Sequence, residues 1–206
     1  MKPLPTSERG LRSRAAIIEA AARLMHDHGL ASPSIDAVLA ASGTGKSQLY
    51  HYFDGRQDLT VAVLHHQFGQ VMAAQPSLTD PACDDLGRWR DEVLRAHRES
   101  GLGTCPLGVF VGQTDGDPVL RDTLADLFTR WQDALTALVA RALAARRVNP
   151  DTDPSAAGRA LLTALQGGTM LSHLRREAEP LARALDDAVD ALTECRSETP
   201  DGMGVE

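Results

Sequence analysis

Aromatic residues are scarce in this chain of 206 residues. Phe, Trp and Tyr supply 4% of the sequence, whereas hydrophobic residues as a whole supply 43%. Alanine and leucine dominate where a strand-rich protein would use valine, isoleucine, threonine and aromatic residues. The composition therefore argues against a sheet and predicts an all-α fold.

Cysteines and long apolar runs are scarce as well. Cys83, Cys105 and Cys195 are far apart and form no CxxC pair, so neither a disulfide framework nor a structural zinc site is indicated. No apolar run reaches the roughly 18 to 20 residues needed to span a bilayer, and the first residues, MKPLPTSERGLRSR, contain no apolar signal core. We expect a cytoplasmic protein with no metal ion, no cofactor and no membrane partner.

The excess of acidic residues lies outside the N-terminal part of the chain. The formal net charge is −7, but residues 1–60 contain seven Lys or Arg against six Asp or Glu. The remaining residues contain 14 basic and 22 acidic side chains. For nucleic-acid binding, the distribution of charge matters more than its sum. The acidic balance therefore does not exclude DNA binding by the N-terminal part.

Apolar residues at helical spacing, interrupted by glycine and proline, predict about nine helices. Three short helices occupy the first 53 residues, with expected ranges 7–28, 34–43 and 45–53. Six more are expected at about 56–75, 81–100, 109–111, 117–147, 153–177 and 179–196. We expect an N-terminal domain (1–55), a larger C-terminal helical domain (56–196) and a disordered tail (197–206).

The segment GTGKSQLYHYF, residues 43–53, begins like a phosphate-binding loop. A Walker A loop reads GxxxxGK[ST], and if Gly45-Lys46-Ser47 were its end, the first glycine would fall at position 40, which is alanine. Such a loop follows a buried strand, whereas the preceding IDAVLAASG has helical spacing. A nucleotide-binding enzyme using Gly45-Lys46-Ser47 is therefore the weaker alternative, and no other enzyme site stands out.

The same segment fits the second helix of a helix-turn-helix, which enters the major groove of DNA. Two short helices meet at Gly43, and Leu49 and Phe53 would anchor the second one. Its outer side chains could then reach base edges and phosphates; they are Lys46, Ser47, Gln48, Tyr50 and His51. In this arrangement the amide of Gln48 suits adenine, and Lys46 suits guanine or phosphate.

The runs Ile35-Asp36-Ala37-Val38 to Gly43, Leu49-Tyr50-His51-Tyr52-Phe53 and Arg56-Gln57-Asp58-Leu59 resemble the TetR family of bacterial repressors. The resemblance covers about residues 11–60. It implies base or phosphate contacts from Thr44, Lys46, Ser47, Gln48, Tyr50, His51 and Tyr52, and a phosphate contact from Arg56. Thr44-Gly45 replaces the usual Val-Ser, and His51-Tyr52 departs from the usual order with histidine second. The target sequence therefore cannot be transferred from the family.

A helix-turn-helix reader gains specificity as a dimer on two half-sites. The expected helices at 153–177 and 179–196 carry apolar residues at helical spacing, which could form a four-helix bundle with a second copy. The predicted dimer contacts are Leu161, Leu165, Gly168, Leu181, Leu185 and Val189. The alternative is that these residues only pack within one chain.

The few aromatic residues of the C-terminal part gather between 68 and 131, where an apolar cavity could hold a small effector. The candidate lining residues are Phe68, Met72, Trp89, His97, Cys105, Phe110, Phe128 and Trp131, and each could instead be plain core. We predict a homodimeric regulator that represses transcription from a palindromic DNA operator and is released by a small apolar molecule. A thiol-based redox sensor acting through Cys105 is the alternative trigger.

Overall fold

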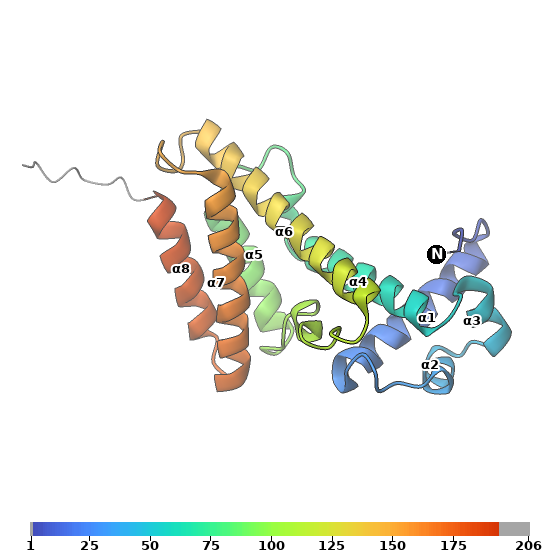
Figure 1. The fold of residues 1–206 in the computed structure, drawn as a ribbon. Coiled ribbons are helices and arrows are strands. Elements are labelled where there is room, and N and C mark those ends of the chain that lie inside the picture. The colour runs from blue at the N-terminus through green and yellow to red at the C-terminus, as the bar shows by residue number, and fades with distance from the viewer. Residues whose placement is uncertain (1, 194–206) are drawn as a thin grey trace, which may run out of the picture.

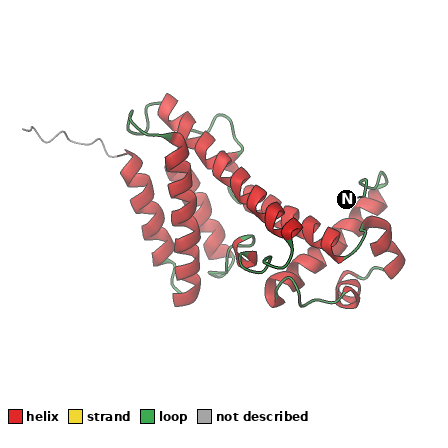
Figure 2. Ribbon diagram, in the orientation of Figure 1, coloured by secondary structure: helices red, strands yellow, loops and turns green. Residues whose placement is uncertain are grey.

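The computed structural model describes residues 2–193, which form eight α-helices and two 3₁₀ turns and contain no strand (Figure 2). The helices are α1 (Glu8–His28), α2 (Ile35–Ser42), α3 (Lys46–Tyr52), α4 (Arg56–Ala73), α5 (Leu86–Glu99), α6 (Pro118–Ala144), α7 (Pro154–Arg175) and α8 (Glu179–Thr193). The 3₁₀ turns are η1 (Pro76–Leu78) and η2 (Gly108–Phe110). The predicted all-α fold is confirmed. No helix formed by these residues has the length and apolar content needed to cross a membrane.

The helices form two groups that are joined by two long helices (Figure 1). α1, α2 and α3 lie at one end of the molecule, and α5, α7 and α8 lie at the other. α4 packs against both α1 and α6, and α6 packs against α7. α4 is therefore in contact with the N-terminal helices at one end and leads toward the C-terminal group at the other.

Side-chain caps and a terminal glycine fix several helix ends. The Ser34 hydroxyl accepts a hydrogen bond from the Ala37 amide at 3.1 Å at the start of α2. The Asp117 carboxylate accepts one from the Val119 amide at 3.0 Å at the start of α6. Each cap pairs an amide that has no partner inside its own helix. α2 ends at Gly43, whose φ of 65° lies in the left-handed region that favours glycine.

Two of the predicted helices differ in the structure. The fifth begins at Leu86 rather than near residue 81, because the Asp85 carboxylate caps a first-turn amide at 3.0 Å. The short helix predicted at 109–111 is the 3₁₀ turn η2. The expected end of the last helix at Arg196 and the expected disorder of 197–206 lie outside the described residues. The division into two domains stays a prediction.

α7 and α8 cross closely at Gly168. A Cβ atom placed on Gly168 would lie 2.9 Å from the Cα of Leu181 and 3.3 Å from the Cβ of Ala184. Protein interiors are close-packed, so these backbone and side-chain atoms have little room to move away. The glycine therefore sets the distance between α7 and α8 within one chain.

We expect Gly168→Ala to lower the free energy of unfolding by about 1–3 kcal/mol, because the added methyl group overpacks the α7–α8 crossing. Urea unfolding of the full chain measures this. Gly69→Ala is the control: Gly69 is exposed on α4, and a Cβ there meets no atom within 4 Å. Alanine should leave that helix unchanged or stabilise it by up to about 1 kcal/mol. Equal effects of the two substitutions would contradict the close crossing.

Candidate functional site

α2 and α3 are two short helices joined by the turn at residues 43–45. α3 packs against α1 and α2 through buried side chains, and Leu49 and Phe53 are 0% and 1% exposed. This apolar face fixes the helix and turns its polar face outward. The arrangement is that of a helix-turn-helix, in which the second helix reads DNA.

The helix that precedes the turn excludes the phosphate-loop interpretation. A Walker A loop follows a β-strand, whereas Gly45-Lys46-Ser47 comes directly after α2 and its turn. Ala40 also stands where the motif requires glycine. The nucleotide-binding alternative is therefore wrong.

Four of the predicted contact residues are exposed on α3, namely Lys46, Ser47, Tyr50 and His51. Tyr50 is 45% exposed, so its ring and hydroxyl group are available to a partner. Gln48 is half-buried, and its Oε1 accepts a hydrogen bond from the Gly45 amide at 3.1 Å. This bond caps α3 where the expected serine is missing, and it uses one of the two acceptor positions of the amide oxygen. The second lone pair of Oε1 and the Nε2 amino group are the groups that a bidentate contact with adenine would use.

The two ends of the predicted contact set, Thr44 and Tyr52, are half-buried. The Thr44 hydroxyl lies 2.7 Å from the Ser42 hydroxyl. The Tyr52 ring packs against the core and meets the His51 ring edge-on, with 5.1 Å between ring centroids. Both side chains therefore help to hold α3 in place and expose less surface than the four residues between them.

Arg56, from which a phosphate contact is predicted at the start of α4, is bonded within the chain, and the phosphate contact stays a prediction. Its guanidinium group donates hydrogen bonds to the carbonyl oxygens of Leu30, at 2.6 Å, and of Pro33. These carbonyls belong to the segment between α1 and α2. Arg56 is thus held inside the chain, where it attaches α4 to the helix-turn-helix.

A contact that the sequence pattern could not reveal supports α3 from the N-terminus. The Lys2 ammonium group donates to the carbonyl oxygen of Tyr50 and lies 3.4 Å from the Asp54 carboxylate. A positive charge stabilises the C-terminal end of a helix. Lys2 is 48 residues away from Tyr50 in the sequence, and only the folded chain brings them together.

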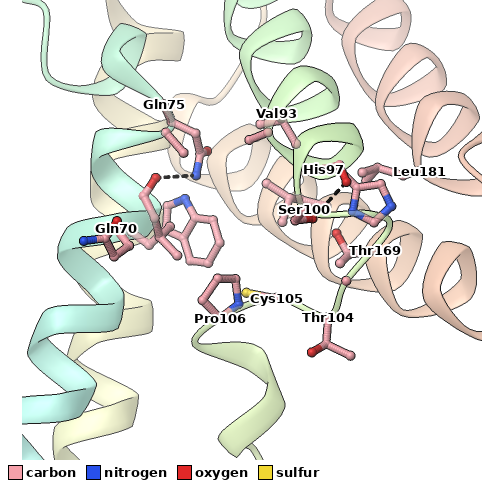
Figure 3. Close-up of a pocket in the computed structure, with 16 residues that line it drawn as sticks. Gln70, Gln75, Val93, His97, Ser100, Thr104, Cys105, Pro106, Thr169 and Leu181 are labelled. Atoms are coloured by element: carbon pink, nitrogen blue, oxygen red, sulfur yellow. Dashed lines mark hydrogen bonds between the residues drawn. The ribbon is translucent and has the colours of Figure 1, made fainter. Parts of the chain in front are cut away.

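A cavity of about 220 Å³ lies where α4, α5, α6, α7 and α8 meet (Figure 3). Gln70 and Gln75 lie on the α4 side, and His97 and Leu181 lie on the opposite side (Figure 3). Cys105 belongs to the segment between α5 and η2 that also contributes to the wall. A second, more open cavity of about 650 Å³ adjoins the first and shares lining residues with it; those shared are Thr104, Cys105 and Thr169.

Half of the predicted cavity residues line a cavity. His97, Cys105 and Trp131 line the first, and Phe128 lines the second. The other four pack elsewhere in or against the core; they are Phe68, Met72, Trp89 and Phe110. The prediction missed small and polar lining residues, among them Gln70, Gln75, Ser100, Thr104 and Thr169. Such residues carry no sequence signal for a cavity.

The cavity walls carry little charge. None of the sixteen residues that line the first cavity is Asp, Glu, Lys or Arg. Burial lowers the pKa of the His97 imidazole, and the nearby His173 lowers it further, so His97 is neutral at pH 7. Burial raises the pKa of the Cys105 thiol, an effect that hydrogen bonds from the neighbouring amides and from Gln166 only partly offset. The cavity therefore suits an apolar, uncharged molecule.

The residues predicted as dimer contacts are buried inside the chain. Leu161, Leu181 and Leu185 are 0% exposed, and Leu165 and Val189 are 4% and 7% exposed. With Gly168 they pack α7, α8 and the neighbouring helices together, and Leu165 and Leu181 also line the cavity. These side chains have little surface left for a second copy, and their part in a dimer contact stays a prediction.

Fold and site together define the class: a helix-turn-helix protein with a cavity in its helical body. Residues 17–63 match the family model described as bacterial regulatory proteins, tetR family. Residues 82–188, more than half of the chain, match that described as tetracyclin repressor-like, C-terminal domain. The chain belongs to the TetR family. It is a DNA-binding transcriptional regulator and not an enzyme.

Known relatives agree with this assignment. The HTH-type transcriptional repressor LfrR of Mycolicibacterium smegmatis is 29% identical over 192 residues, which cover 92% of this chain and 94% of the relative. The transcriptional regulator AcuR of Cereibacter sphaeroides is 24% identical over 176 residues, which cover 81% of this chain and 78% of AcuR. The crystal structure of a regulatory protein TetR from Rhodobacter sphaeroides has the same fold, with a TM-score of 0.75 at 22% identity, covering 87% of this chain and 98% of that one.

We expect Cys105 to react slowly with iodoacetamide at pH 7, because the raised pKa keeps it in the thiol form. Peptide mass spectrometry that follows the Cys105 peptide measures the rate, and the urea-unfolded chain is the control. The folded rate should be several-fold lower and should rise with pH. Faster alkylation in the folded protein would instead support the redox-sensor alternative.

Proposed function

We propose that the protein is a homodimeric repressor that binds a palindromic operator through α3 and is released when a small molecule enters the cavity. The observation that supports this most strongly is the position of α4. Arg56 at its start is bonded to the helix-turn-helix, and Gln70 and Val71 near its end line the cavity. One helix therefore contacts both parts that a ligand-responsive regulator must couple.

A second link runs through the segment that follows η2. Gln113 accepts a hydrogen bond from the Leu30 amide at 2.8 Å and donates one to the Val109 carbonyl at 2.7 Å. Val109 lines the second cavity, and Leu30 follows the end of α1. A ligand that moves this wall would shift the attachment of α1. If the ligand binds the shifted conformation more tightly and DNA binds it more weakly, the ligand lowers the affinity for DNA. DNA then lowers the affinity for the ligand by the same factor.

The outer face of α7 supports dimerisation. Met170 and Leu174 are 64% and 76% exposed, although both are large and apolar. They continue a row of exposed or half-buried residues at helical spacing, which is Ala156, Ala160, Thr163 and Gly167. Exposed apolar residues that form a continuous patch mark interaction surfaces, and small residues permit a second helix to approach closely. We assign this row, rather than the buried leucines, to the contact with a second copy.

The DNA-binding role predicts the effect of removing the exposed charge of α3. Lys46→Ala should weaken binding to the selected operator and reduce the slope of log K against log salt by about 1, because one phosphate contact is lost. Selection of bound genomic DNA fragments gives the operator, and a salt titration gives the slope. Arg95→Ala, on the exposed face of α5, also removes one positive charge but lies far from α3. It should change neither the operator affinity nor the salt slope. Identical slopes for wild type and Lys46→Ala would contradict the phosphate contact.

The dimer surface predicts that Met170→Glu with Leu174→Glu raises the dimer dissociation constant by about tenfold or more, since burying two carboxylates on a shared face is unfavourable. Sedimentation velocity over a concentration series measures it. Val119→Glu is a matched control, because Val119 is apolar and 51% exposed but lies at the start of α6. A double variant that stays dimeric would place the interface on another surface.

A further inference from the structure

The two cavities meet at three residues, Thr104, Cys105 and Thr169, which line both of them. We call these three residues the junction. Cys105 and Thr169 both border the first cavity in Figure 3. A molecule that is too long for the first cavity passes the junction to reach the second. The chemistry of the junction therefore acts on any ligand that occupies both cavities.

Two of the junction residues already use their polar groups within the chain. The Thr104 hydroxyl lies 3.5 Å from His26 Nε2, and Cys105 Sγ accepts a hydrogen bond from the Gly108 amide at 3.2 Å. Thr169 Oγ1, in contrast, makes no hydrogen bond to any other group of residues 2–193. It is the junction group that is left for a ligand.

The Thr169 hydroxyl is unpaired but still accessible. Thr169 as a whole is 7% exposed. Among residues 2–193, the unpaired side-chain polar atoms with almost no accessible surface are His97 Nε2 and Trp131 Nε1. Thr169 Oγ1 is not one of these, so it keeps surface that another molecule can reach. Because Thr169 is buried except where it lines the cavities, that surface faces the cavities.

Other threonines show the usual arrangement in a helix, in which the hydroxyl donates to the carbonyl four residues earlier. Thr60 is 2% exposed, and its hydroxyl donates to the Arg56 carbonyl at 2.9 Å. Thr163, on α7 like Thr169, donates to the Arg159 carbonyl at 2.9 Å. The chain therefore pairs a helical threonine in the core and one on the same helix, while the hydroxyl at the junction stays unpaired.

The walls and sizes of the cavities narrow the choice of ligand. Neither cavity is lined by Asp, Glu, Lys or Arg, so an ionic ligand would lose its hydration without meeting a carboxylate, ammonium or guanidinium group. A cavity of about 150 Å³ in another protein accepts benzene, so the 220 Å³ of the first cavity suits about four to six carbon atoms. A larger apolar ligand must extend into the second cavity, which has about 650 Å³.

We propose that the effector is an uncharged, elongated molecule that occupies both cavities and carries a neutral polar group near its middle, hydrogen-bonded to Thr169 Oγ1. A hydroxyl group both donates and accepts, so a carbonyl, hydroxyl or amide group of the ligand suits this position. The inference rests on the proposed function in one respect, that these cavities are the effector site. The bond to Thr169 fixes where the ligand lies along the two cavities.

Two ketones of the same composition test this on the full-length protein. The oxygen of 5-nonanone lies at the middle of the chain, and that of 2-nonanone lies near one end. When the oxygen pairs with Thr169, 5-nonanone places a butyl group in each cavity, whereas 2-nonanone leaves one cavity with a single methyl group. Isothermal titration should show that 5-nonanone binds about fivefold more tightly. Nonanoate and nonylammonium should bind more weakly than either ketone.

Matched substitutions locate the effect. Thr169→Val keeps the shape of the side chain and removes the hydroxyl group, so the affinity for 5-nonanone should fall several-fold and the two ketones should bind about equally. Thr60→Val removes a buried hydroxyl that is already paired and lines neither cavity, so the preference for 5-nonanone should remain. In a methyl NMR spectrum of the wild type, 5-nonanone should move the Thr169 signal and leave the Thr60 signal in place. This test does not depend on either variant.

The outcomes separate this inference from the proposed function. Equal affinity for the two ketones in the wild type, a preference that survives in Thr169→Val, tightest binding of an ion, or no binding of any probe would overturn the inference, even if operator binding is found. A preference for 5-nonanone that depends on Thr169 but has no effect on operator binding would support the ligand chemistry and contradict release by a ligand. Loss of operator binding on adding 5-nonanone would support both.

Discussion

The hydrogen bonds from Arg56 to the segment between α1 and α2 determine how the two parts of this molecule are arranged. Backbone carbonyl groups in a partly buried connection need partners, and Arg56 supplies them for Leu30 and Pro33. Because Arg56 is the first residue of α4, this contact fixes the start of α4 on the helix-turn-helix. α4 has 18 residues and is therefore about 27 Å long. A rigid helix of that length therefore links the position of the helix-turn-helix to the wall of the cavity.

Both backbone groups of Leu30, its amide and its carbonyl, are bonded to side chains from other parts of the chain. Its carbonyl oxygen accepts from Arg56, and its amide donates to Gln113, which is bonded in turn to the carbonyl of Val109 beside the second cavity. The side chain of Leu30 is 4% exposed and belongs to the core. A change in the cavity wall and a change in α4 would therefore reach the helix-turn-helix at the same residue. This convergence would give a ligand, in the proposed mechanism, two physical routes to one attachment point.

The sequence predicted the parts of this structure that depend on local rules, and missed those that depend on distant partners. The helix starts at Ser34 and Asp117 and the stop at Gly43 follow from capping chemistry, which acts over a few residues. The role of Arg56 could not be predicted, because its acceptors lie 23 and 26 residues away. An arginine at a helix start looks the same in sequence whether it binds phosphate or backbone.

The sequence located the cavity only in part, and it did not show which apolar residues of α7 and α8 are buried within the chain. Aromatic residues do not by themselves mark a cavity, because their size also favours full burial, as at Trp89 and Phe110. The regularly spaced leucines of α7 and α8 pack against each other within one chain. Apolar spacing alone cannot distinguish such packing within a chain from packing against a second copy. The exposed residues Met170 and Leu174 lie on the same helix, but only the observed packing identifies them as exposed.

The two buried indoles differ in how their N–H groups are paired. Trp89 and Trp131 are almost equally buried, yet only Trp89 has a partner for its N–H group. Selection for stability alone would favour a partner for Trp131 or a residue without a donor at that position, because an unpaired buried donor destabilises the free protein.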